Sequence, residues 1–160
     1  MVFTRRRPAI PPLNTGSRTV EPSDDAKYLG IYLDKRLNWE KHFKHIKKKT
    51  MFRIHQLYPI FTSQSIPLQK KTHLYKALIR SSMLYGAPVW CNAPKRFLNS
   101  LQILQNKMAR MSTGADIYTR ISLLQTLFET PYIGEVIQAL TQKTQATIKN
   151  STNPLINTIT

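Results

Sequence analysis

From residue 38 onward, hydrophobic positions recur every three or four residues, which is the period of an amphipathic helix. The pattern predicts helices over residues 38–58, 67–85, 94–111, 119–128 and 132–149. Asn38 is a favourable N-cap for the first, and Gly114 is the natural stop after the third. Three apolar stripes can share one core and leave the lysines outside, as in a small helical bundle. The stripes are Trp39, Phe43, Ile46, Thr50, Ile54 and Leu57; Leu68, Thr72, Tyr75, Leu78 or Ile79, and Ser82; and Phe97, Leu101, Leu104, Met108 and Met111.

Residues 1–34 show strands and turns instead. Short strands are predicted at 1–5 and 17–20, with turns at 14–17 and 22–25, and the best strand is the run 27–33. Gly30 inside that run indicates a bulge or a close backbone approach. Alternation along one strand would place Tyr28 and Tyr32 on the face of Gly30, opposite the aliphatic side chains. The predicted fold class is mainly α, with short N-terminal strands followed by a small helical bundle.

Length and composition narrow the class of protein. With 160 residues and 41% hydrophobic residues, the chain can bury the core of one domain, or of one and a half small ones. No apolar run reaches the roughly 18 residues of a membrane span, so we expect no membrane insertion. The single Cys91 excludes an internal disulfide framework and a Cys-based zinc ribbon. Without a secretory signal, an intracellular, reducing setting is expected.

The charge is concentrated in one part of the chain. The formal net charge is +16, from 24 Lys and Arg against 8 Asp and Glu. Residues 35–55 carry eight basic and one acidic residue, and residues 56–111 carry eight basic and no acidic residue. The segments 1–34 and 112–160 are close to neutral. Such an excess is typical of proteins that bind a polyanion, and nucleic acid is the first candidate.

Candidate catalytic groups are few. Two-metal catalysis needs carboxylates that hold both metal ions, and the only adjacent pair in the sequence, Asp24-Asp25, lies in a predicted turn. His42, His45 and His55 lie on a lysine-rich helix that would repel a cation, so we expect surface histidines and no metal site. Cys91 is expected to be a buried structural residue. The sequence therefore predicts no catalytic residue and no metal ligand.

A colinear series of short motifs covers about residues 1–135. It resembles the reverse transcriptase, or RNA-directed DNA polymerase, of jockey-like non-LTR retrotransposons, a group of insect mobile elements. No single motif is specific; their order is. The series consists of Lys27-Tyr28-Leu29-Gly30, Leu33-Asp34, Arg36-Leu37, Trp39, Leu74-Tyr75-Lys76-Ala77, Leu84-Tyr85-Gly86, Val89-Trp90, Leu101-Gln102, Gln105-Asn106-Lys107 and Arg110.

The resemblance implies a segment map. Residues 1–34 would be the end of the palm with the primer-grip β-hairpin, and residues 35–114 a thumb-like helical bundle. Residues 115–149 would be connecting helices, and 150–160 a flexible tail. The fingers and the palm core, with their catalytic aspartates and magnesium, would lie outside this chain. The chain alone is thus expected to be inactive and to need no cofactor, while the parent element would work in the nucleus.

The resulting hypothesis is a grip on an RNA–DNA or DNA template–primer duplex. Lysine suits a surface that follows phosphates rather than base edges. The candidate binding residues are Lys27, Tyr28, Leu29, Gly30, Lys41, Lys44, Lys47, Lys48 and Arg53. Tyr28 and Tyr32 could stack on bases or pack in the core, and Arg5-Arg6-Arg7 could contact phosphate or be solvated.

Two other classes of protein stay open at this point. The first basic helix could lie on an anionic membrane surface, because it combines an apolar stripe with a lysine-rich face. Alternatively, the chain could be a free-standing helical DNA-binding module. Its recognition helix would then use Asn99, Gln102, Gln105 and Asn106 to read base edges.

Overall fold

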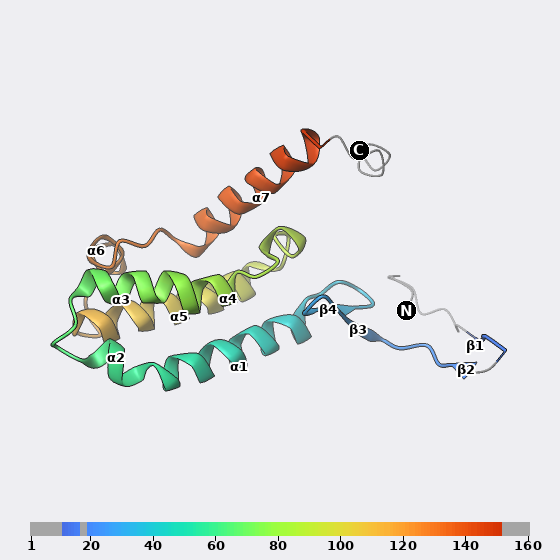
Figure 1. Ribbon diagram of the computed structural model, residues 1–160, viewed down its shortest axis with the longest axis horizontal. Helices are drawn as coiled ribbons and strands as arrows, with labels where there is room; N and C mark the ends of the chain where they lie inside the picture. Colours follow the sequence, from blue (N-terminus) through green and yellow to red (C-terminus); the bar gives the residue numbers. More distant parts are fainter. Residues whose placement is uncertain (1–10, 17–18, 152–160) are drawn as a thin grey trace. The chain divides into compact units, whose positions relative to one another are not determined.

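The computed structural model describes residues 11–16 and 19–151, and the chain divides into two compact units, Met1–Ile46 and Lys47–Thr160. The predicted fold class, mainly α with a short N-terminal β-hairpin, is confirmed (Figure 1). The elements are β1 (Leu13–Asn14), β2 (Thr19–Val20), β3 (Asp25–Tyr28), β4 (Ile31–Asp34), α1 (Glu40–Gln56), α2 (Tyr58–Thr62), α3 (Leu68–Leu74), the π-helix η1 (Tyr75–Arg80), α4 (Ser81–Met83), the 3₁₀ helix η2 (Ala87–Val89), α5 (Lys95–Thr113), α6 (Ile121–Leu127) and α7 (Ile133–Lys149).

The best predicted strand is in fact a hairpin. Strands β3 and β4 pair antiparallel, and Tyr28 lies opposite Ile31. Only Leu29 and Gly30 join them, with φ of 44° and 81°. Two positive φ angles in a two-residue connection are typical of a type I′ turn, whose twist matches that of the strands. The continuous strand 27–33 with a bulge at Gly30 was therefore a wrong prediction, whereas the hairpin implied by the resemblance is confirmed.

The turn also changes which side chains share a face. Lys27 lies opposite Tyr32 in the ladder, so these two project to one side of the hairpin. Tyr28 and Ile31 project to the other side. The predicted common face of Tyr28 and Tyr32 is wrong, because strand alternation restarts after the chain reverses.

A second, smaller strand pair precedes the hairpin. Leu13 lies opposite Val20, and Asn14 lies opposite Thr19. The Asn14 side chain accepts a hydrogen bond from the Gly16 amide at 3.0 Å, which is an Asx-turn contact in the predicted turn. The predicted strand 1–5, the Arg5-Arg6-Arg7 run, residues 17 and 18, and most of the predicted tail lie outside the described residues.

The helix α1 is capped from the end of β4. The Asp34 carboxylate accepts hydrogen bonds from the backbone amides of Asn38 and Trp39, both at 2.9 Å. The helix begins at Glu40, directly after Trp39, which has φ of 65°. Asn38 is thus not the N-cap. The helix begins two residues after Asn38, and the Asp34 carboxylate holds the backbone amides of the two residues that precede it.

Removing this cap should destabilise the 1–46 unit. We expect Asp34→Ala to lower its free energy of unfolding by about 1 kcal/mol, because two backbone amides lose their hydrogen-bond acceptor. The amides of Asn38 and Trp39 should also lose protection in hydrogen-exchange measurements. Asp24→Ala is the matched control, because Asp24 pairs only with the Lys35 side chain at 3.3 Å on the surface. Unchanged protection in Asp34→Ala would contradict the capping role.

The second predicted helix is continuous but not uniform. Elements α3, η1 and α4 form one run from Leu68 to Met83, with a π-helical middle. Arg53 donates from Nη1 to the Leu78 carbonyl oxygen in that middle part, at 2.7 Å. Ile79 is buried and Leu78 is exposed, which settles the open position in the stripe. The short helix α2 was not predicted, since Pro59 was taken only as the end of the first helix.

Helix α5 is the centre of the 47–160 unit and contacts α2, α3, α6 and α7. Figure 1 shows the α3–α4 run alongside it. Its predicted stripe is confirmed at Leu101, Leu104 and Met108, and it ends at Gly114, which has φ of 67°. The large, fully buried side chains of this unit include Phe61, Tyr75, Trp90 and Phe128.

Candidate nucleic-acid interface

Basic side chains surround the Tyr32 ring within the 1–46 unit. The Lys27 and Lys41 ammonium groups lie 5.6 and 5.8 Å from the ring centroid, which is cation–π distance. The His45 ring lies 4.9 Å away on the same helix as Lys41. We call Lys27, Tyr32 and Lys41 the Tyr32 cluster. It joins one face of the hairpin to the first turn of α1 and places two ammonium groups beside one ring.

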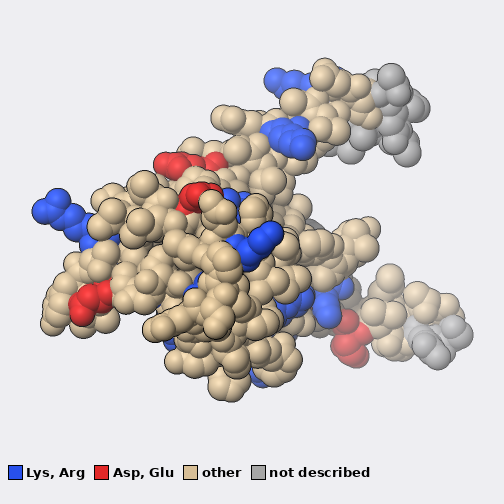
Figure 2. All heavy atoms as spheres, turned by 60° about the vertical axis from the view of Figure 1, so that its left-hand side comes forward, with Lys and Arg blue, Asp and Glu red and all other residues tan. Residues whose placement is uncertain are grey.

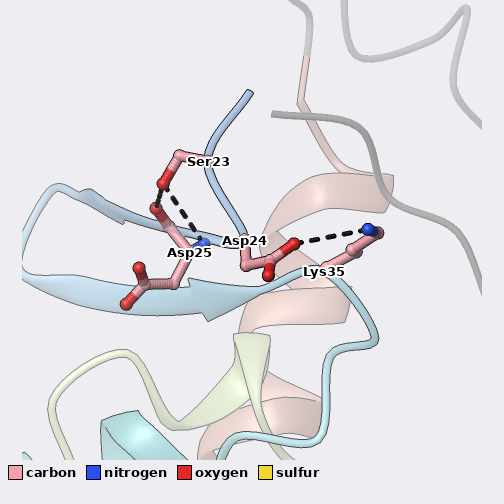
Figure 3. A network of polar contacts seen from close by, with 4 residues as sticks. All are labelled: Ser23, Asp24, Asp25 and Lys35. Atoms are coloured by element: carbon pink, nitrogen blue, oxygen red, sulfur yellow. Dashed lines mark hydrogen bonds and ion pairs between the residues drawn. The ribbon is translucent and has the colours of Figure 1, made fainter. Parts of the chain in front are cut away.

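The two adjacent carboxylates near this cluster pair with lysines. Figure 3 shows the Asp24 and Asp25 carboxylates pointing in different directions, with Asp24 toward Lys35. Asp25 forms an ion pair with Lys41. The Ser23 hydroxyl donates to the Asp25 carbonyl oxygen at 2.6 Å and accepts from the Asp25 amide at 3.4 Å (Figure 3). Within the described residues no group of three potential metal ligands comes together.

The lysines of α1 lie away from its buried side. Lys41, Lys44 and Lys48 follow one another at helical spacing, opposite the buried Phe43 and Thr50. All three of Lys47, Lys48 and Lys49 are exposed. Lys44 forms a surface ion pair with Glu40 at 2.9 Å, a contact that contributes little free energy.

The tip of the hairpin is open to solvent. Tyr28 is 67% exposed and Leu29 is 72% exposed, and Gly30 beside them is exposed as well. Trp39, in contrast, is buried, as predicted. The sequence left open whether Tyr28 and Tyr32 stack on bases or pack in the core. Tyr28 does not pack in a core, whereas Tyr32 packs among basic side chains.

Arg53 occupies a different environment from the lysines. It is half-buried, and its guanidinium supplies a donor to the irregular part of the second helix. A π-helix shifts the backbone hydrogen-bond pattern, and an arginine that bonds one of its carbonyls supports that shift. Arg53 was predicted as a binding residue, and the structure shows it in a structural contact.

Two buried bases escaped sequence reasoning. Lys71 is buried and donates from Nζ to the Ser112 carbonyl oxygen in the last turn of α5, at 3.2 Å. A cation near a helix C-terminus is stabilising. Lys71 lies beside the predicted apolar stripe of its own helix, and nothing in that position predicted its burial against the end of α5. His42 is also buried, and its Nδ1 accepts from the Tyr32 amide at 3.4 Å. Burial, with a smaller effect of His45, lowers the pKa of His42 to about 4.

The expectation of three surface histidines on α1 is therefore wrong for His42. It is correct for His55, which is exposed, while His45 is half-buried. The error has a simple origin: His42 lies one position from Phe43, at the edge of the apolar stripe, where helical period alone cannot separate inside from outside. Cys91 is likewise half-buried rather than buried.

Comparison with known proteins finds similar sequences among the RNA-directed DNA polymerases of mobile elements. The chain is 32% identical over 123 residues to a probable RNA-directed DNA polymerase from transposon X-element of Drosophila melanogaster. It is 28% identical over 144 residues to the RNA-directed DNA polymerase from mobile element jockey of the same species. It is 24% identical over 156 residues to the jockey protein of Drosophila funebris. These matches cover 76%, 89% and 97% of this chain.

The chain belongs to the jockey-like RNA-directed DNA polymerases. It spans 14%, 16% and 17% of the length of the three relatives. No protein-family model matches it, and no solved structure does. The resemblance stated from the ordered motifs is thereby confirmed, and the chain corresponds to one segment of a much longer polymerase.

The structure disfavours a free-standing recognition helix in this polymerase segment. Gln105 and Asn106 are buried, and the Gln102 side chain donates to Asn106 Oδ1 and accepts from the Ile133 amide, both at 2.8 Å. Of the four proposed base-reading residues only Asn99 is exposed. Side chains committed to internal hydrogen bonds are poorly placed to read base edges, so that alternative is not favoured.

The other alternative is a membrane-surface protein, for which hydropathy and surface charge are relevant. Among the residues that the structure describes, no helix combines the length and the apolar character that a bilayer crossing requires. Figure 2 shows basic and acidic side chains interspersed among uncharged ones on the face drawn. The Tyr32 cluster and, separately, the exposed lysines of α1 are the candidate contacts for nucleic acid among the described residues.

Proposed function

We propose that this segment grips the template–primer duplex of a jockey-like reverse transcriptase, with the β3–β4 hairpin as primer grip and the helices as thumb. The observation that carries the proposal is the Tyr32 cluster, in which Lys27 and Lys41 flank one ring at the junction of hairpin and helix. The similarity to RNA-directed DNA polymerases supports nucleic acid as the partner. The absence of Asp and Glu from residue 41 to residue 115 of the sequence supports a polyanion in particular.

Phosphate contact follows from the chemistry of the cluster. A duplex presents about one negative charge per 1.7 Å of axis, and each ammonium group that meets a phosphate releases a counterion. Lys41 already has a carboxylate partner in Asp25, so a phosphate would share or replace that partner. Lys27 keeps its ammonium beside the Tyr32 ring and completes the pair. Binding of this kind follows the shape and charge of the duplex and carries no base preference.

The hairpin tip would approach the primer from its exposed side. Gly30 has no side chain, and the side chains of Tyr28 and Leu29 beside it are exposed. A glycine in a tight turn lets another backbone come close, which a primer strand needs. Synthesis itself would depend on the aspartates and the magnesium ions of the remaining polymerase. This segment would supply position and hold the duplex.

The test is the salt dependence of binding to a fluorescein-labelled RNA–DNA hybrid, followed by fluorescence anisotropy. The logarithm of the association constant should fall linearly with the logarithm of salt concentration. We expect Lys41→Gln and Lys48→Gln each to reduce the slope by about one and to weaken binding uniformly across hybrid sequences. Lys143→Gln is the matched control, because Lys143 is an exposed lysine of α7 far along the chain.

Three results would count against this function. One is binding that is insensitive to salt, and another is an equal loss of slope in Lys143→Gln. The third is tighter binding to anionic phosphatidylserine vesicles than to the hybrid, which would favour the membrane-surface alternative. Arg53→Gln should change stability rather than the slope, since Arg53 bonds the Leu78 carbonyl.

A further inference from the structure

An open apolar groove lies within the 47–160 unit, between α2, the middle of α5 and the segment that leads to α6. Its volume is about 730 Å³, and Tyr58, Ile103, Met111, Ile117 and Ile121 line it. Ile103 is 65% exposed and Ile117 is 71% exposed. The neighbouring Tyr118 is 88% exposed. Several large apolar side chains gathered at one exposed place are a common mark of an interaction surface.

The groove is built by a second face of α5. The buried face of this helix holds Leu101, Leu104 and Met108. Ile103 and Lys107, four residues apart, lie on another face and line the groove, and Met111 at the edge of the buried face lines it as well. Ile103 and Lys107 lie outside the buried face and are exposed. Their arrangement fits a partner that lies along α5.

The rim of the groove is basic. Lys107 and Arg110 line it together with the aliphatic side chains, and no Asp or Glu is among the described lining residues. Arg110 also donates from Nη2 to the Thr119 carbonyl oxygen at 3.4 Å, which ties the segment after α5 to the helix. An aliphatic floor with cations at its edge is complementary to apolar side chains flanked by carboxylates.

A nucleic-acid occupant fits this groove poorly. Single strands bind by stacking bases on aromatic rings along a positive channel, and Tyr58 is the only aromatic residue among the described lining residues. A duplex has no apolar side chains to bury against Ile103, Ile117 and Ile121. An amphipathic helix, in contrast, places apolar residues at successive turns into such a groove and its charged residues on the rim.

We propose that the α2–α5 groove binds an acidic amphipathic helix of a protein partner. The aliphatic side chains of that helix pack against Ile103, Ile117 and Ile121, and its carboxylates form ion pairs with Lys107 and Arg110. This surface is separate from the Tyr32 cluster and does not depend on the proposed grip of a duplex.

The probe is a fluorescein-labelled synthetic helix of roughly 18 residues, five turns, with leucines on one face and glutamates elsewhere. The control peptide has the same composition with its leucines spread around the helix. Anisotropy titrations use the full chain. We expect the amphipathic peptide to bind at least tenfold more tightly than the control peptide, because only it can bury a continuous apolar face.

Neutral substitutions separate the groove from the general positive charge of the chain. Ile103→Gln should weaken peptide binding by about tenfold or more, whereas Ile148→Gln, at an exposed isoleucine of α7, should leave it unchanged. Circular dichroism checks that both variants fold, and neither should alter binding to the RNA–DNA hybrid. Lys107→Gln should weaken peptide binding by a smaller factor, and this factor should decrease as salt is added.

Any of four results would overturn the proposal. Equal affinity for both peptides would show binding by charge alone. Unchanged affinity in Ile103→Gln would place the peptide elsewhere. Displacement of the peptide by the RNA–DNA hybrid would assign the groove to nucleic acid. Self-association of the chain that Ile103→Gln abolishes, without peptide binding, would assign the groove to a second copy.

Discussion

Replacing Gln105 with leucine is expected to lower the free energy of unfolding of the 47–160 unit by about 3 kcal/mol. Gln105 is buried in α5, where its Oε1 accepts from the Tyr75 hydroxyl at 2.9 Å and its Nε2 donates to the Pro131 carbonyl oxygen at 2.8 Å. Leucine has a similar volume, so it leaves no large cavity. It does leave two polar groups without a partner in the interior, each at about 1 to 3 kcal/mol.

The same bonds join three parts of the unit. Tyr75 opens the π-helix η1, and its ring packs against Phe128 with centroids 5.2 Å apart. Pro131 precedes α7, whose first amide donates to the neighbouring Gln102. Burial raises the pKa of the Tyr75 phenol, so its hydroxyl stays a donor. Loss of Gln105 should therefore loosen α7 from α5 as well as reduce stability.

Urea denaturation measures the change, with Asn99→Leu as the control at an exposed position of α5. A double-mutant cycle with Tyr75→Phe separates the two bonds. If the Tyr75 hydroxyl needs Gln105, the double variant should be less destabilised than the sum of the single variants. Strict additivity, or a loss below about 1 kcal/mol in Gln105→Leu, would contradict the proposed network.

Acidification is expected to destabilise the 1–46 unit by about 2 kcal/mol between pH 7 and pH 4.5. Burial lowers the pKa of His42 from 6.5 to about 4 in the folded chain. The unfolded chain therefore binds the proton first as the pH falls. The stability contributed by neutral His42 is complete above pH 6.5 and is lost as the pH falls toward 4. Local opening that admits water keeps the expected loss below the full value of the pKa shift.

The pH dependence is measured by urea denaturation at several pH values, followed by circular dichroism. His42→Gln should be less stable at pH 7 but should flatten the curve between pH 7 and pH 4.5. His55→Gln, at an exposed histidine of the same helix, should keep the steep curve. Equal curves for His42→Gln and the native chain would disprove the assignment.

The spacing of hydrophobic residues by three or four positions predicted the buried side chains well, because burial in a helix follows that period. The predicted stripe positions Phe43, Ile46 and Ile54 of α1 are buried, and so are Leu101, Leu104 and Met108 of α5. Each long predicted helix is present with ends within a few residues of the prediction, and Gly114 ends α5 as expected. These features depend only on neighbours within a few residues, which the sequence lists in order.

The same reasoning could not predict contacts between residues that are distant in the sequence. Gln105, thought able to read a base edge, bonds Tyr75, which lies 30 residues away in the sequence. Lys71 was counted with the surface charge, although the end of α5 holds it inside. In each case a polar side chain found a partner that is distant in sequence. No local pattern encodes that pairing.

The sequence alone determined the helices, the basic region without Asp or Glu and the similarity to jockey-like polymerases. Periodicity, charge and the order of motifs can all be read from the order of residues along the chain. Only the tertiary structure decided that Leu29 and Gly30 reverse the chain. It alone placed Lys27 and Lys41 at the Tyr32 ring and left the Ile103 face of α5 uncovered. The physical reason is that a cation, a ring or an apolar face acquires its role from the groups that folding brings beside it.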